Sequence, residues 1–185
     1  MILIICIIAI IVIVFSIIGM YNNMVSLRNN REKSFADMDV QLRQRHDLIP
    51  NLVEAVKGYM QHEASTLIAV TEARSGAMNA RTIDEKIASE NLLGSALQGL
   101  KVSIERYPDL KANENFLKLQ DEISDIENKI AASRRFFNST TKEYNTQIQK
   151  FPANLLANMF GFHKEVFFDL GADRAVVSEA PKVKF

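Results

Sequence analysis

The first twenty positions are uncharged and almost entirely apolar, whereas the rest of the chain mixes apolar and polar residues at helical spacing. Ten of these twenty residues are isoleucine. A helix rises about 1.5 Å per residue, so twenty residues reach about 30 Å, the thickness of the hydrocarbon core of a bilayer. Residues 1–20 are therefore predicted to form a transmembrane anchor.

A cleaved signal peptide is the alternative interpretation of this segment. It requires a basic N-terminal region, a shorter apolar core and small residues before the cleavage site. The segment has no basic residue, and both Ser16-Ile17-Ile18 and Ile17-Ile18-Gly19 place an isoleucine where a small residue is needed. We therefore expect the anchor to be retained.

Beyond residue 20, apolar side chains recur at the heptad spacing of a helix that packs on other helices. One column contains Phe35, Leu42, Ile49, Val56 and Val70, and the other contains Met38, Leu52, Tyr59 and Ala73. Interruptions at Arg45, Glu63 and Thr66 favour a globular bundle over a strict two-stranded coiled coil, whose seam is more uniformly apolar.

Pro50 lies inside this pattern and has no backbone N–H. It is expected either to kink the helix or to restart it with Asp47 as the N-cap, and the sequence leaves both options open. The periodicity ends around residues 75–79. Thr82-Ile83-Asp84-Glu85 then has the form of a capping box, which predicts the start of a second helix.

The second and third helices have clear apolar faces. Leu93, Ala96, Leu97, Leu100 and Ile104 form the buried face of the second, which must end by Tyr107 because Pro108 follows. The third begins near Asn113, and Pro152 ends it. Its apolar positions are Phe116, Leu119, Ile123, Ile126, Ile130, Phe137, Tyr144, Ile148 and Phe151.

Together these elements predict an all-α protein, with an N-terminal transmembrane helix followed by an elongated antiparallel bundle of long helices over residues 21–153. A short helix and an aromatic cap are expected over residues 154–171, and a disordered tail over residues 172–185. The aromatic run Phe162, Phe167 and Phe168 either covers the end of the bundle or forms an exposed docking or lipid-contact patch, which is rarer for so short a run.

Composition supports this prediction and excludes some partners. Seven glycines and four prolines in 185 residues favour long helices over a turn-rich fold. Lys and Arg number 22, as do Asp and Glu, so the chain lacks the clustered basic excess of a nucleic-acid-binding protein. The single cysteine, Cys6, lies within the predicted anchor, which excludes a disulfide framework.

The flanks of the anchor predict its orientation. One residue precedes the apolar run, whereas Arg28, Arg31 and Lys33 follow within fifteen residues of it. Basic residues are enriched on the cytoplasmic side of membrane helices. We therefore expect the N-terminus outside and the bundle in the cytoplasm.

The sequence contains no arrangement that points to catalysis. His62-Glu63 begins like a zinc-protease motif, but the second histidine four residues later is missing. There is no Gly-x-Ser-x-Gly elbow and no glycine-rich phosphate loop. Acidic residues such as Asp37, Asp39, Glu54 and Glu63 fit a solvated helix face or ion pairs. We expect no enzymatic activity, no cofactor and no metal.

Several local stretches are similar to one known family. They span nearly the whole chain in order: Tyr21-Asn22, Asp39-Val40-Gln41-Leu42, Arg45, Asp47-Leu48-Ile49-Pro50-Asn51-Leu52-Val53-Glu54, Val56-Lys57-Gly58-Tyr59, His62-Glu63, Ala73-Arg74, Glu90-Asn91-Leu92, Tyr107-Pro108-Asp109-Leu110-Lys111-Ala112, Phe116, Leu119-Gln120, Phe137-Asn138, Tyr144-Asn145, Phe151-Pro152 and Gly161-Phe162. With these stretches the chain resembles the LemA family of bacterial membrane-anchored helical proteins. It departs at Phe35, where the family commonly has tryptophan.

The resemblance implies a single-pass protein of the bacterial inner or plasma membrane, with a short external N-terminus and a cytoplasmic bundle. It implies no known catalytic site. The leading hypothesis is a homo-oligomeric scaffold that holds lipid through residues 1–20 and organises the envelope or recruits unknown protein partners. The candidate contact residues are Arg45, Asp47, Pro50, Asn51, Glu54 and Tyr59. The alternatives are a membrane-linked sensor or signalling module and an adaptor of a membrane protease.

Overall fold

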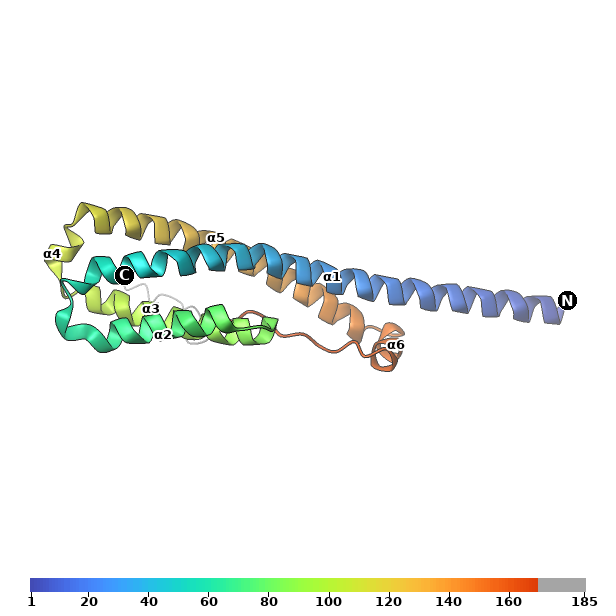
Figure 1. Cartoon of the computed structure of the whole chain (residues 1–185). Coiled ribbons are helices and arrows are strands. Elements are labelled where there is room, and N and C mark those ends of the chain that lie inside the picture. Colours follow the sequence, from blue (N-terminus) through green and yellow to red (C-terminus); the bar gives the residue numbers. More distant parts are fainter. Residues whose placement is uncertain (170–185) are drawn as a thin grey trace, which may run out of the picture. The chain divides into compact units, whose positions relative to one another are not determined.

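The computed structural model describes residues 1–169, and these residues contain helices and no strands. In chain order the elements are α1 (Ile2–Lys57), a 3-10 turn (Gln61–Glu63), α2 (Ala64–Asn79), α3 (Ile83–Ile104), α4 (Pro108–Lys111), α5 (Glu114–Gln149) and α6 (Ala153–Met159) (Figure 1). The predicted all-α class is confirmed. The tail predicted over residues 172–185 lies outside the described residues.

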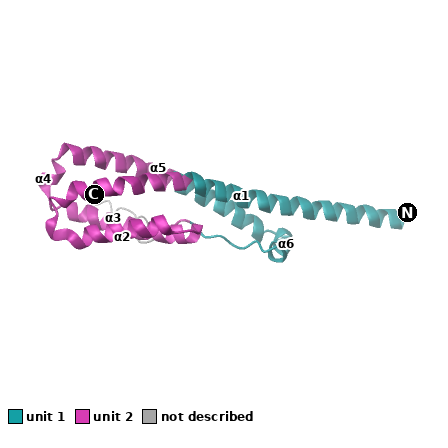
Figure 2. Cartoon of the chain, viewed as in Figure 1, with its two compact units in different colours: residues 1–37, 133–167 teal, residues 38–132, 168–185 magenta. Residues whose placement is uncertain are grey.

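The chain divides into two compact units (Figure 2). Unit 1 contains residues Met1–Asp37 and Ser133–Phe167, and unit 2 contains residues Met38–Ala132 and Phe168–Phe185. Both α1 and α5 therefore contribute one part to each unit, and the units are described separately below.

The N-terminal part of α1 is the segment of the described chain that is long and apolar enough to cross a membrane. None of its most apolar eighteen-residue window is buried inside the protein. Exposed isoleucine and leucine side chains along a whole helix are unfavourable in water, and they are satisfied in lipid. This part of α1 therefore has the properties of the predicted anchor.

The break after α1 differs from the expectation. The helix continues through Pro50, so a restart with Asp47 as N-cap is wrong. It ends instead at Lys57, just before Gly58, although the apolar columns continue through this point. The N–H groups of Tyr59 and Met60 both bond to the carbonyl of Val56, and the resulting turn buries Met60 completely.

Unit 2 is a bundle in which the α1 segment, α2, α3 and the α5 segment run in alternating directions (Figure 1). Its core draws on every one of these elements and on α4. The core residues are Ile49, Leu52, Val56, Met60, Leu67, Val70, Ala77, Leu93, Leu100, Leu110 and Phe116. These side chains lie at the 3–4 spacing of the predicted apolar faces, because that spacing puts them on one side of each helix.

The helix starts in unit 2 follow local capping chemistry. The backbone N–H of Glu85 donates to Oγ1 of Thr82, and the N–H of Thr82 donates to the Glu85 carboxylate, each at 3.2 Å, which confirms the predicted capping box. At the start of α5, the side-chain oxygen of Asn113 accepts from the N–H groups of the second and third helical residues at 3.0 and 3.1 Å.

Unit 1 packs the α1 segment against the end of α5 and against α6. Phe35 and Phe137 meet edge to face, with ring centroids 5.4 Å apart. After α6, Gly161 has φ +73°, a left-handed conformation that glycine adopts without strain. The following N–H, of Phe162, then bonds to the carbonyl of Ala157 at 2.9 Å, and this closure places Phe162 in the core.

The segment after α6 is tied to both helices of unit 1. Asn145 makes two backbone hydrogen bonds to Glu165, each 2.8 Å long, and the hydroxyl of Tyr144 donates to the carbonyl of His163 at 3.0 Å. The Glu165 carboxylate lies 3.1 Å from the buried guanidinium of Arg31. Of the predicted aromatic run, Phe162 and Phe168 are buried and Phe167 is 41% exposed.

Candidate functional site

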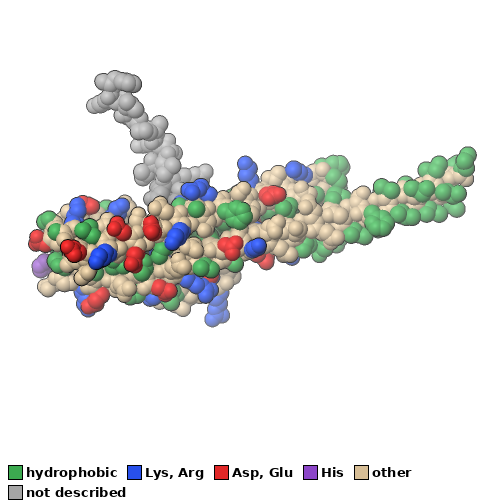
Figure 3. All heavy atoms as spheres, turned by 90° about the horizontal axis from the view of Figure 1, so that it is seen from above, with side chains coloured by type: hydrophobic (Ala, Val, Ile, Leu, Met, Phe, Trp, Pro, Cys, Tyr) green, Lys and Arg blue, Asp and Glu red, His purple; other side chains and the backbone are tan. Residues whose placement is uncertain are grey.

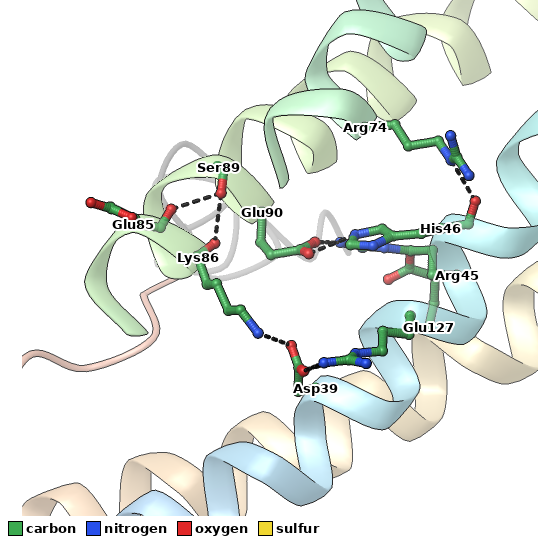
Figure 4. Close-up of polar contacts among 10 residues, drawn as sticks. Asp39, Arg45, His46, Arg74, Glu85, Lys86, Ser89, Glu90 and Glu127 are labelled. Carbon is green, nitrogen blue, oxygen red and sulfur yellow. Dashed lines mark hydrogen bonds and ion pairs between the residues drawn. The ribbon is translucent and has the colours of Figure 1, made fainter. Parts of the chain in front are cut away.

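The polar centre of unit 2 begins with Pro50. In a regular helix the N–H at position 50 would bond to the carbonyl of His46, four residues earlier, but proline has no N–H to offer. That carbonyl instead accepts a hydrogen bond from Nε of Arg74, on α2, at 2.6 Å (Figure 4). Arg74 therefore replaces the backbone donor that Pro50 removes, which explains how α1 passes through a proline.

The side chains of the same turn of α1 point to α3 and α5 (Figure 4). His46 Nε2 lies 2.7 Å from one carboxylate oxygen of Glu90, and the guanidinium of Arg45 binds the other oxygen. Arg45 Nη1 also lies 2.8 Å from Oε1 of Glu127. The Arg45, His46 and Glu90 residues are 6%, 5% and 4% exposed. One turn of α1 is thus joined to α2, α3 and α5.

The electrostatics of this network hold its charges in place. Burial by itself lowers the pKa of Arg45, but the negative charges of Glu127 and Glu90 outweigh burial and raise it. The guanidinium therefore stays charged, as the buried carboxylate of Glu90 requires.

About two helical turns earlier, Asp39 joins the same helix to α3. Its carboxylate lies 2.7 Å from Nζ of Lys86 on α3 and 2.9 Å from Nη2 of Arg43. Burial by itself raises the pKa of Asp39, but the hydrogen bonds and charges of Lys86 and Arg43 lower it below the ordinary value.

This arrangement joins helices that are far apart in the sequence. The Arg45, His46 and Glu90 side chains are buried, and Glu90 binds both of the others. Within residues 1–169, no cluster of His, Cys, Asp and Glu has an arrangement that could hold a metal ion. The network fixes the mutual register of the helices of unit 2.

The predicted contact residues separate into two groups. Arg45 is buried in the ion network of the single chain, where its carboxylate partners are the buried Glu90 and the 43% exposed Glu127. Its role in a contact surface stays a prediction. Asp47, Pro50, Asn51 and Glu54 are exposed on one side of α1. Tyr59 is 41% exposed, and its hydroxyl accepts a hydrogen bond from Asn113 at 3.2 Å.

An open groove of about 520 Å³ lies beside this exposed side of α1, between the end of α1 and α2. It is lined by Val53, Glu54, Lys57, Met60, Gln61, Ala64, Leu67, Ile68, Thr71 and Glu72. Apolar side chains form much of the lining, and its charged residues are Glu54, Lys57 and Glu72. A surface of this shape and composition suits a protein helix.

Sequence reasoning missed Arg74, Glu90 and Glu127. The interruption of the seam at Arg45 was one available signal, because a charge on a buried face requires a partner. Glu90 was a second, since it lies three residues before Leu93 and so continues the apolar face of α3. The identity of the acidic residues that bind Arg45 depends on how separate helices pack.

A family model described as "LemA family" matches residues 34–185. This chain belongs to the LemA family. The match covers both the Pro50 turn and the segment after α6.

Two curated proteins are similar to this chain. Protein LemA of Metamycoplasma hominis is 26% identical over 157 residues, covering 83% of this chain and 71% of the relative. Magnetosome protein MamQ of Magnetospirillum gryphiswaldense is 23% identical over 174 residues, covering 80% of this chain and 64% of the relative, so the chain spans less than two thirds of that protein. The family and the apolar helix together identify a membrane-associated helical protein.

Proposed function

We propose that this chain is a membrane-anchored scaffold that self-associates, with the groove between α1 and α2 of one copy receiving α3 of another. The observation that carries the proposal is the groove itself, which lies on unit 2 next to the exposed Asp47–Glu54 side of α1. Ile68 in the groove is 55% exposed, and the buried residues Leu67 and Met60 also line the groove. Such apolar lining gains free energy when another helix covers it.

The same chain offers a helix face that fits the groove. Leu92 and Val102 of α3 are 68% and 61% exposed, and the exposed residues Ser95 and Gly99 lie between them. These four residues follow a 3–4–3 spacing and carry no charge. A helix docks into a groove through residues at this spacing, and the small side chains allow a close approach.

The two surfaces differ, so the contact is heterologous. A heterologous contact repeated from copy to copy forms a ring if it closes and an open array if it does not. Asp47, Asn51 and Glu54 would then form the polar rim of the contact. A scaffold of this kind requires no catalytic activity, and either assembly would organise the membrane or recruit further proteins.

The test is the particle mass of the full-length protein after gentle extraction in detergent. The wild type is expected as an oligomer. Gly99→Arg is the sharpest variant, because a Cβ at Gly99 meets no atom within 4 Å in the single chain. This substitution also removes a glycine from a helix interior, which favours the folded chain by roughly 1 kcal/mol. It should nevertheless reduce the particle to a monomer.

Ile68→Lys should also dissociate the particle, whereas Glu122→Arg, at an exposed position of α5, serves as the matched control and should leave the mass unchanged. Circular dichroism verifies that helicity is retained. A monomeric wild type overturns the proposal, and a second protein bound to that monomer would favour the adaptor role. An oligomer unaffected by Gly99→Arg and Ile68→Lys places the contact elsewhere.

Crosslinking tests which surfaces meet. In a Cys6→Ser background, chains with Ile68→Cys and chains with Leu92→Cys are mixed and oxidised. The groove and α3 contact predicts a disulfide between the two kinds of chain and little crosslinking of either kind alone. Crosslinks within each kind, and none between kinds, would indicate a symmetric contact and contradict the proposal.

For the orientation, we propose a bacterial inner or plasma membrane with the N-terminus outside and the residues after the anchor in the cytoplasm. Arg28 and Lys33 are exposed after the anchor, whereas Arg31 is buried against Glu165. In the Cys6→Ser background, Glu122→Cys should react with an impermeant maleimide only after the cells are lysed. Labelling in intact cells would reverse the topology.

A further inference from the structure

The helix α6 has a buried side that ties it to the end of the predicted membrane span. Leu156 and Ala157 pack with Met24 of α1 in the core of unit 1. Ile17 and Met20, at the end of the apolar run, pack against the same cluster. Because these residues belong to one core, α6 lies at the level where α1 leaves the hydrocarbon region.

The other side of α6 carries Leu155 and Met159 with the polar Asn158, and all three residues are exposed. Leu155 is 61% exposed and Met159 is 70% exposed. The residues at either end of the helix, Phe151 and Phe160, are 81% and 50% exposed. Figure 3 shows hydrophobic side chains gathered beside the apolar helix of unit 1. Four large apolar side chains within ten residues are costly to keep in water.

The charge pattern around α6 matches that of a membrane-surface segment. The twelve residues from Phe151 to Phe162 carry no charge, whereas Lys150 precedes them and Lys164 follows. Uncharged aromatic and aliphatic side chains favour the boundary between headgroups and acyl chains, and flanking lysines favour anionic headgroups.

The aromatic residues beside α6 support the same location. The ring of Tyr21, which directly follows the predicted span, lies 5.1 Å from the Phe160 ring and 5.7 Å from the Phe162 ring, centroid to centroid. The guanidinium of Arg28 lies 5.3 Å from the centroid of Phe162. Tyrosine and arginine side chains with apolar neighbours are typical of membrane interfaces, where one end meets lipid and the other meets water.

We propose that α6 is a second membrane contact, in which Phe151, Leu155, Met159 and Phe160 insert into the headgroup boundary of the bilayer that residues 1–20 cross. This contact does not depend on self-association. It fixes the tilt and rotation of unit 1 at the membrane, since one helix alone leaves both free and a second contact point does not.

The chain contains no tryptophan, so a single substitution creates a specific fluorescent probe. Full-length Leu155→Trp is reconstituted in vesicles of phosphatidylethanolamine and phosphatidylglycerol, with and without brominated acyl chains. Its emission should be blue-shifted, should lose intensity with the brominated lipid, and should resist aqueous iodide. Phe15→Trp, within the span, is the positive control for insertion of the anchor.

Phe136→Trp is the matched aqueous control, because Phe136 is 59% exposed on the α5 segment of the same unit. It should be quenched by iodide and not by brominated lipid. If Leu155→Trp behaves like Phe136→Trp while Phe15→Trp is quenched by brominated lipid, the proposal is wrong although the anchor is inserted. Protection of Leu155→Trp from both quenchers would show that protein covers α6, which also overturns the proposal.

Discussion

The hydrogen bond from Arg74 to the carbonyl of His46 should be energetically coupled to Pro50. Arg74→Met removes the donor and leaves the carbonyl without a partner, because Pro50 still supplies no N–H. Pro50→Ala restores that N–H, so the helix can close its own hydrogen bond. The two substitutions should therefore be strongly non-additive, and the cost of Arg74→Met should be much smaller in the Pro50→Ala background.

The structure indicates how much stability Arg74→Met should cost. The bond is short, at 2.6 Å, its donor is a guanidinium, and its environment is partly buried. Leaving such an acceptor unpaired costs about 1–3 kcal/mol. In a protein of this length that loss lowers Tm by roughly 2–12 °C. When position 50 supplies an N–H, most of the loss disappears, and we expect a coupling free energy of about 1–2 kcal/mol between the two positions.

The assay is a double-mutant cycle on the full-length protein in detergent, with unfolding followed by circular dichroism. Wild type, Arg74→Met, Pro50→Ala and the double variant are compared under identical conditions. Arg135→Met, an exposed arginine on α5, measures the effect of removing an arginine side chain without this bond. If Arg74→Met costs the same free energy of unfolding with proline and with alanine at position 50, the reasoning is refuted.

Three further predictions concern other polar contacts. Arg45→Met should destabilise the protein by about 3–5 kcal/mol in chemical unfolding, because it leaves the buried Glu90 carboxylate without its cation, and Glu90→Gln in the same chain should restore part of the loss. Asn145→Ala should cost about 1–3 kcal/mol and speed hydrogen exchange at the Glu165 N–H, whereas unchanged exchange would show that this bond does not hold the segment. Folding lowers the pKa of Asp39, so the ionised carboxylate stabilises the folded protein above its unfolded pKa, and this stabilisation is lost as the pH falls below about 3.8. The difference in unfolding free energy between wild type and Asp39→Asn should therefore shrink below that pH. A difference that stays constant with pH would contradict the assignment.

Local sequence determined several features of this fold. Twenty uncharged apolar residues dictate a helix that fits a bilayer, and the reciprocal bonds of Thr82 and Glu85 start α3 because both partners lie within four residues. Likewise, the Asn113 cap lies at the start of α5, and the proline follows its end. Each of these features depends on residues that are neighbours in the chain, so the pattern alone was sufficient.

Tertiary packing decided where the chain turns after α1 and which residues bind Arg45. The apolar columns predict no break at Gly58, yet the chain turns there and not at Pro50, and the turn buries Met60 in the core of unit 2. Likewise, the sequence showed that Arg45 interrupts the apolar seam but not which residues it binds, because its partners, Glu90 and Glu127, are 45 and 82 residues away. Periodicity reports which side of one helix is apolar, but it carries no information about which residues of another helix face it. Two features depend on which residues of different helices face each other. They are the buried ion pair of Arg45 with Glu90 and the hydrogen bond by which Arg74 replaces the missing N–H of Pro50. Both form only when the helices have packed.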